Sequence, residues 1–145
     1  MTAQPTPPPT PRPTPRFDAI GLVVSDMAAS VAFYRRLGFA FPDGAETAPH
    51  AEAPLPGGLR LLLDTEAGVR AFHPGFEPPT GSRHSLALLC DSPAEVDRVY
   101  EDLVGAGHEG ELKPWDAPWG QRYAVVHDPD GHGVDLFAPL APGTA

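Results

Sequence analysis

Two tryptophans lie close together in residues 113–122, where prolines and a glycine favour a loop that enters a strand. A large aromatic side chain in a loop stays exposed unless it packs on something, and a planar small molecule is a natural partner for Trp115 and Trp119. The alternative for Trp119 is that its ring fills the gap between the loop and the sheet. We therefore expect an aromatic binding surface here, with further apolar wall from some of Phe41, Phe72, Phe76, Tyr123 and Phe137.

The other reactive side chains lack the neighbours that catalysis needs. Cys90 ends an apolar run with no predicted base beside it, which favours packing in the core over nucleophilic chemistry. The sequence contains no GxSxG, Walker A or GxGxxG pattern. We expect five histidines at the surface or in turns, since they lack the spacing of metal ligands: His50, His73, His108, His127 and His132.

The composition restricts the class of partner. The 145 residues carry a formal net charge of -9 and include one lysine, Lys113. Because phosphate neutralisation dominates nucleic-acid affinity, we expect no nucleic-acid partner, whereas the negative charge would favour cationic ligands. No apolar run approaches the roughly 18 residues of a membrane helix, and the start lacks a signal peptide's apolar stretch, so we expect no membrane association. The single cysteine excludes an intrachain disulfide, and we expect a cytoplasmic protein.

An internal repeat supplies the elements that would position these side chains. Residues 19–26 and 84–91 are strand-length apolar runs, and we align Asp26 with Asp91 at their ends. A stripe of apolar residues with helical spacing follows each run. The second helix begins with a capping box at residues 92–95, and glycines end both helices.

Each helix leads to short strands, so the order β-α-β-β-β occurs twice and the fold class is α+β. The first module takes residues 17–67 and the second takes residues 83–140, within one domain of residues 17–140. The expected strands after the helices are 39–41, 45–48 and 59–64 in the first module, and 109–113, 122–127 and 134–138 in the second.

Proline and glycine mark the remaining segments. Residues 68–82 are predicted to be the linker between modules. Residues 1–16 hold seven prolines and are predicted to form an extended, mobile tail. Residues 141–145 are predicted to fray.

Two motifs carry a resemblance to a known family. Residues 22–39 contain an Asp before a helix and the run Phe33-Tyr-Arg-Arg-Leu-Gly-Phe39, and residues 118–137 contain Asp128-Pro-Asp-Gly131. Over residues 17–140 the chain resembles the vicinal oxygen chelate superfamily, which contains glyoxalase I, extradiol dioxygenases, fosfomycin-resistance enzymes and bleomycin-resistance binding proteins. The resemblance implies the glyoxalase/bleomycin-resistance fold. In that fold two βαβββ modules form a cup-shaped mixed sheet around a small-molecule cavity, commonly in a homodimer, and the cup closes within one chain or across two.

The resemblance also allows a test for a metal. Metal enzymes of this superfamily hold a divalent ion on up to four side chains from the first and last strand of each module, typically His or Gln and Glu. The corresponding residues are Ala19 and Arg60 in the first module and His84 and Asp135 in the second. Ala19 cannot ligate, and Arg60 is a permanent cation that would repel an ion. We therefore favour no cofactor; if Fe, Mn, Ni, Co or Zn binds, His84 and Asp135 are the candidates.

Without a metal, Asp135 is expected to pair with Arg60, or Arg60 is expected to bind a carboxylate or phenolate of the ligand. The resulting hypothesis is a protein that captures a hydrophobic or aromatic compound, such as an antibiotic, without turnover. Its expected binding residues are Trp115, Trp119, Arg60, Phe41, Tyr123 and Phe137, and no catalytic residue is predicted. The alternatives are a metal-dependent lyase or isomerase, thiol transferase or ring-cleaving dioxygenase, and an accessory module that acts through the proline-rich tail.

Overall fold

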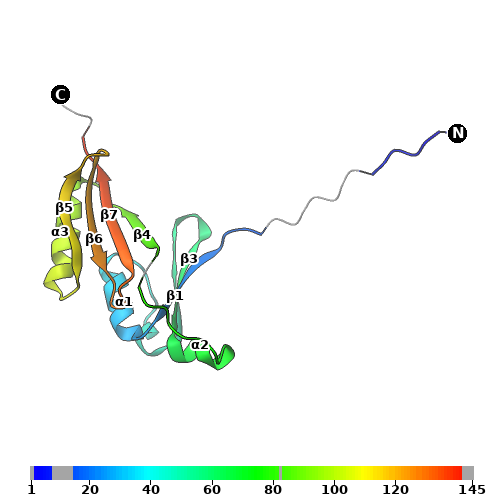
Figure 1. Ribbon diagram of the computed structural model, residues 1–145, viewed down its shortest axis with the longest axis horizontal. Coiled ribbons are helices and arrows are strands. Elements are labelled where there is room, and N and C mark those ends of the chain that lie inside the picture. Colours follow the sequence, from blue (N-terminus) through cyan, green and yellow to red (C-terminus); the bar gives the residue numbers. More distant parts are fainter. Residues whose placement is uncertain (1, 8–14, 82, 142–145) are drawn as a thin grey trace.

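The computed structural model describes residues 2–7, 15–81 and 83–141. Residues 1 and 8–14 of the predicted tail and residues 142–145 of the predicted frayed end lie outside the described residues. Residues 2–7 and 15–16 are exposed and form no helix or strand, and Figure 1 shows the N-terminal segment leading away from the folded domain. In the described part of the chain, no helix is both long enough and apolar enough to cross a membrane.

The first module contains one helix between strands, followed by a short second helix. Asp26 begins α1 by accepting a hydrogen bond from the backbone N–H of Ala29 at 3.1 Å. Strand β1 runs parallel to β3, and β2 runs antiparallel to β3, in the order β1-β3-β2. The elements are β1 (Ala19–Val24), α1 (Met27–Arg36), η1 (Ala45–Thr47), β2 (His50–Pro54), η2 (Pro56–Gly58), β3 (Arg60–Thr65) and α2 (Glu66–Phe72).

This sheet has three strands, so the strands expected at 39–41 and 45–48 are wrong. The guanidinium of Arg35 donates to the carbonyl oxygens of Phe41 and Pro42, at 3.3 and 2.9 Å. Those oxygens are therefore already bonded, and proline has no N–H to give to a ladder. The strand begins later, at His50.

Helix α2 lies partly within the predicted linker, residues 68–82. Thr65 caps it by accepting a hydrogen bond from the backbone N–H of Gly68 at 3.0 Å. The seven-residue helix is too short to display a periodic stripe in the sequence.

The second module has the complete β-α-β-β-β order. Ser92 caps α3 by accepting a hydrogen bond from the backbone N–H of Glu95 at 3.1 Å, and Glu95 accepts from the backbone N–H of Asp91. The strand order is β4-β7-β6-β5, with β4 parallel to β7. The elements are β4 (Ser85–Leu89), α3 (Pro93–Gly105), β5 (Gly110–Ala117), β6 (Gln121–His127) and β7 (Gly133–Pro139). The α+β fold class is confirmed.

Each sheet buries one apolar face, and the two buried faces form one shared core. Leu22 and Leu63 of the first sheet belong to the same cluster of buried residues as Val126 and Leu136 of the second. Helix α1 joins the modules, because its Phe33 ring packs edge-on against His108 of the second module, with ring centroids 4.8 Å apart. Figure 1 shows α1 between the two sheets and α3 along the second sheet. Strand side chains alternate, so the other face of each sheet points away from this core.

Candidate functional site

A hollow of about 510 Å³ lies on the face of the second sheet that points away from the core. Its lining comes from the second sheet and from the chain that leads into β4, with no residue from residues 17–67. The first module of the same chain therefore does not close it. The lining residues are Gly81, Arg83, His84, Ser85, Glu111, Tyr123, Val125, His127, Gly131, Gly133 and Asp135.

A row of apolar side chains crosses the whole sheet beside this hollow. Trp115 is the cross-strand partner of Tyr123, Tyr123 is the partner of Phe137, and Phe137 is the partner of Leu89. Direct cross-strand partners point to the same face of a sheet, so the four side chains form one continuous strip. We call these four residues the aromatic row.

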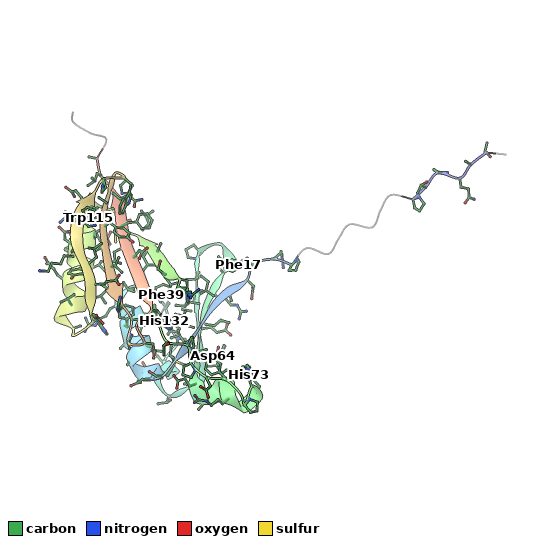
Figure 2. The ribbon with its side chains drawn as sticks, in the orientation of Figure 1. Phe17, Phe39, Asp64, His73, Trp115 and His132 are labelled. Atoms are coloured by element: carbon green, nitrogen blue, oxygen red, sulfur yellow. The ribbon has the colours of Figure 1, made fainter. Side chains whose placement is uncertain are left out.

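Trp119 extends the aromatic row at the β5–β6 turn. Its ring packs edge-on against Trp115 and Tyr123, with centroids 5.7 and 5.3 Å apart, and its indole N–H donates to Gln121 at 2.9 Å. Trp119 is nevertheless 56% exposed, Trp115 is 39% exposed and Leu89 is 67% exposed. The rings support one another and still leave faces for a ligand. Figure 2 shows Trp115 on β5, far from the first module.

The hollow becomes polar next to the aromatic row. Asp135 accepts a hydrogen bond from the Ser85 hydroxyl at 3.2 Å and another from Tyr123. Burial, and then the bond to Asp135, raise the pKa of Tyr123 to about 12, so its hydroxyl stays protonated at neutral pH. His127 lies between two carboxylates, 3.4 Å from Glu109 and 3.3 Å from Glu111. A ligand in the hollow would meet an apolar strip on one side and polar groups of both charge signs on the other, since Arg83 lines the hollow together with Glu111 and Asp135.

The two candidate metal ligands both line this hollow. Asp135 lies on β7, and His84 immediately precedes β4, with its ring centroid 5.9 Å from that of His132. Within residues 2–7, 15–81 and 83–141, no group of three or more His, Cys, Asp and Glu side chains is placed to hold a metal ion.

Arg60 lies on the other sheet, and its expected pairing with Asp135 is wrong. Its guanidinium donates to Glu52 at 2.6 Å and to Asp18. His50 continues this network, with Nε2 at 2.7 Å from Glu52 and Nδ1 at 2.6 Å from Asp64. These hydrogen bonds, that of Glu52 first, raise the pKa of His50 above its ordinary value. Arg60 is thus held by carboxylates of its own module and does not line the hollow.

Phe41 is also absent from the hollow. Its side chain belongs to the shared core and is 7% exposed, so it does not form wall of this hollow as expected. The loop conformation that replaces the expected strand buries it. Phe72 is 77% exposed on α2, away from the aromatic row.

Comparisons with known proteins agree with this architecture. The sequence profile of the Glyoxalase/Bleomycin resistance protein/Dioxygenase superfamily matches residues 16–136. The chain belongs to this superfamily.

Two solved structures and one curated relative illustrate the similarity. A glyoxalase/bleomycin resistance protein/dioxygenase from Nocardioides is 31% identical with a TM-score of 0.69, and the match covers 90% of this chain and 87% of that one. A glyoxalase/bleomycin resistance protein/dioxygenase family enzyme from Burkholderia phytofirmans PsJN is 17% identical with a TM-score of 0.74, and the match covers 86% of this chain and 98% of that one. This similarity shows that the two proteins share the fold. The uncharacterized protein YraH of Bacillus subtilis (strain 168) is 27% identical over 134 residues, 83% of this chain and 96% of its own length.

Strand pairing revises which residues correspond between the modules. The helix caps are Asp26 and Ser92, so the counterpart of Asp26 is Ser92 rather than Asp91. The counterpart of Ala19 is therefore Ser85, and His84 stands one residue outside the strand.

The correspondence between the last strands also changes, by two residues. Gly21 pairs with Leu62, and its counterpart Ala87 pairs with Asp135, so Leu62 rather than Arg60 corresponds to Asp135. The four positions at which superfamily enzymes carry metal ligands are thus Ala19, Leu62, Ser85 and Asp135. One carboxylate and one hydroxyl are fewer donors than the three or more protein ligands that typically hold a catalytic transition-metal ion.

Ser85 and Leu89 are among the site residues that sequence reasoning missed. Ser85 contacts Asp135, and Leu89 completes the aromatic row. Leu89 was concealed in a continuous apolar run, residues 86–89, in which alternation cannot separate the buried face from the exposed one.

Proposed function

We propose that this protein captures a planar, hydrophobic or aromatic compound on the aromatic row and does not convert it. The supporting observation is the continuous strip of Trp115, Tyr123, Phe137 and Leu89 beside a polar hollow that contains the Asp135 carboxylate. Apolar rings give the contact area, and Asp135 gives a preference for ligands with a positive charge. The poor donor set at the superfamily's metal positions supports capture over metal-dependent turnover.

A homodimer is part of this proposal. The hollow is open and its lining contains no residue of residues 17–67, while Trp119 and Leu89 remain more than half exposed. A second copy placed over the second sheet would cover this apolar surface and enclose the ligand.

Tryptophan fluorescence tests the binding proposal directly, because the chain contains two tryptophans and both lie at this site. We expect 9-aminoacridine, a planar aromatic cation, to quench their emission saturably. Trp119→Ala should weaken binding about ten-fold or more, since stacking contributes on the order of 1 kcal/mol and desolvated area adds to it. Phe72→Ala, which removes an exposed ring elsewhere, is the matched control and should bind like the unaltered protein.

Two different measurements would show that the compound does not bind or that the protein converts it. Quenching that is linear in dye concentration, as for free tryptophan, would contradict the proposed site. The capture proposal would also be wrong if mass spectrometry found the compound chemically changed after incubation with the protein and Fe(II), Mn(II), Ni(II), Co(II) or Zn(II).

A further inference from the structure

A proline-rich segment precedes the folded domain. Residues 5–16, which we call the proline-rich segment, contain seven prolines and two arginines, with no acidic and no large apolar residue. Those of its residues that the structure describes, 5–7 and 15–16, are exposed and belong to no helix or strand. A sequence of this composition favours the polyproline II conformation, which grooves lined with aromatic side chains recognise in other proteins.

The aromatic row has the features of such a groove. Trp115 and Leu89 form its two ends and are 39% and 67% exposed, and Trp119 beside Trp115 is 56% exposed. Tyr123 and Phe137 lie between the ends and are half-buried. The row lies on paired strands and its rings support one another, so little ordering is needed when an extended chain binds to it.

The spacing of the prolines matches the spacing of the row. Neighbouring strands are about 4.8 Å apart, so Trp115 and Phe137, which lie two strands apart, are separated by roughly 9.6 Å. A polyproline II helix rises about 3.1 Å per residue with three residues per turn, so every third residue lies on one edge at intervals of about 9.3 Å. Pro5, Pro8 and Pro11 have this spacing in the sequence. Consecutive prolines of this edge therefore fit alternate members of the row.

The charges are complementary as well. Residues 17–145 contain eight Lys and Arg and 19 Asp and Glu, whereas residues 1–16 contain two arginines and no acidic residue. Near the row, the side chains of Glu109 and Glu111 are 74% and 58% exposed and contact His127, which lines the hollow. Arg83 lines the hollow from the chain that leads into β4, at the opposite edge of the sheet. The β5 edge is therefore the side that attracts the arginines of the proline-rich segment.

The place where the segment joins the domain indicates which copy of the chain it meets. It ends shortly before β1, and Figure 1 shows β5 and β6 on the far side of the domain from β1, with residues 2–7 leading away. At about 3.1 Å per residue, residues 5–16 span roughly 37 Å, which is long enough to reach the second sheet of a neighbouring molecule. The geometry thus favours the row of a second copy over the row of the same chain.

We propose that the proline-rich segment of one copy binds the aromatic row of a second copy. Pro5, Pro8 and Pro11 lie against the rings, and the arginines lie near Glu111. Because the segment and a small molecule use the same rings, the segment competes with the ligand and regulates access to the row. This inference goes beyond the proposed function, since the segment can bind whether or not a small molecule does.

A synthetic peptide of residues 1–16 is the probe for the test. It contains no Trp, Tyr or Phe, so the emission in a titration of the full chain comes from the two tryptophans of the protein, Trp115 and Trp119. We expect a saturable change in this emission and displacement of bound 9-aminoacridine by the peptide. Trp115→Ala, followed through Trp119, should weaken the peptide about ten-fold, and Phe72→Ala should leave its affinity unchanged.

Two variant peptides test the proline spacing. Both lose three prolines and therefore a similar share of polyproline II preference. The first removes the proposed edge and should bind about ten-fold more weakly; it carries Pro5→Ala, Pro8→Ala and Pro11→Ala. The second keeps that edge and should bind within about two-fold of the original peptide; it carries Pro7→Ala, Pro9→Ala and Pro13→Ala.

A third peptide tests the charges. Arg12→Gln and Arg16→Gln together should weaken binding about three-fold, because exposed ion pairs contribute little each. Glu111→Gln in the protein should have a similar effect on the original peptide and a smaller one on the third peptide.

A spin label distinguishes binding to a second copy from binding within one chain. The label is attached to Thr2→Cys in protein without ¹⁵N, since residue 2 is exposed and Cys90 is 9% exposed, and this protein is mixed with ¹⁵N-labelled full chain. We expect the indole signals of Trp115 and Trp119 to broaden in the mixture.

Three results would overturn the proposal. These are no change in emission up to millimolar peptide, equal losses for the two proline variants, and broadening that occurs only when the label and ¹⁵N are on the same chain. If 9-aminoacridine binds saturably while the peptide does not, the inference fails and the proposed function stands. If the peptide binds and the dye does not, the proposed function fails and the inference stands.

Discussion

The phenol oxygen of Tyr34 lies 2.7 Å from Oδ2 of Asp128, which joins helix α1 of the first module to the β6–β7 turn of the second. Both residues are buried, with Tyr34 0% and Asp128 4% exposed. Oδ1 of Asp128 accepts from the backbone N–H groups of Asp130 and His132 at 2.9 and 2.8 Å. One carboxylate therefore organises the turn and connects it to the first module.

Tyr34→Phe should destabilise the protein without altering the fold. The variant leaves one oxygen of a buried carboxylate without its partner, which costs about 1–3 kcal/mol. Urea unfolding followed by circular dichroism measures the loss. Tyr100→Phe is the matched control, because Tyr100 is a second tyrosine with little exposure, 9%. If Tyr100→Phe lowers the free energy of unfolding as much as Tyr34→Phe does, the Tyr34–Asp128 hydrogen bond makes no particular contribution to stability.

The His50 network should make the first sheet sensitive to pH. Hydrogen bonds that the His50 ring donates to the carboxylates of Glu52 and Asp64 raise the pKa of His50. The stabilisation is therefore present below the ordinary histidine pKa of about 6.5 and is lost as the pH rises through the higher pKa in the folded protein. Imidazole NMR should give a titration midpoint above the ordinary value. Glu52→Gln should lower that midpoint, and a midpoint that does not move would contradict the network.

Metal uptake should be low. After incubation with Fe(II), Mn(II), Ni(II), Co(II) or Zn(II) and desalting, we expect less than about a tenth of an equivalent by elemental analysis, because the positions of Ala19, Leu62, Ser85 and Asp135 do not supply a donor set. Near-stoichiometric uptake that is lost in both His84→Ala and Asp135→Ala would instead favour a metal-dependent enzyme.

Self-association should depend on the exposed end of the aromatic row. Light scattering at micromolar concentration should give a dimer, and Leu89→Asp should give a monomer because it places a charge in the proposed apolar contact. Phe72→Asp alters an equally exposed apolar residue on α2 and should remain dimeric. If the unaltered protein is a monomer in this measurement, the homodimer in the proposed function is wrong.

The local signals in the sequence were sufficient for the fold class. Apolar alternation in residues 19–26, the cap at Asp26 and the capping box at residues 92–95 act over a few neighbouring residues, so they can be read from the chain itself. The same holds for the exposed position of Trp119, since a loop with prolines and a glycine keeps a large ring near the surface.

The composition of the site depended on tertiary structure. Whether Asp26 corresponds to Asp91 or Ser92 is a shift of one residue, and in a strand such a shift moves a side chain to the opposite face. Ser85 in place of His84, and Leu62 in place of Arg60, became apparent only from the cross-strand pairs. The partners of Arg60 were beyond sequence reasoning for a related reason: Glu52 reaches it through β2, a strand that alternation did not predict.

The sequence by itself therefore determined the repeated strand–helix order and the acidic, aromatic character of the surface, because both follow from residue types and short-range spacing. Tertiary structure decided which face each side chain occupies, that α1 lies between the modules, and that the first module does not close the hollow. These properties arise from strand register and packing between residues far apart in the chain, such as Tyr34 and Asp128.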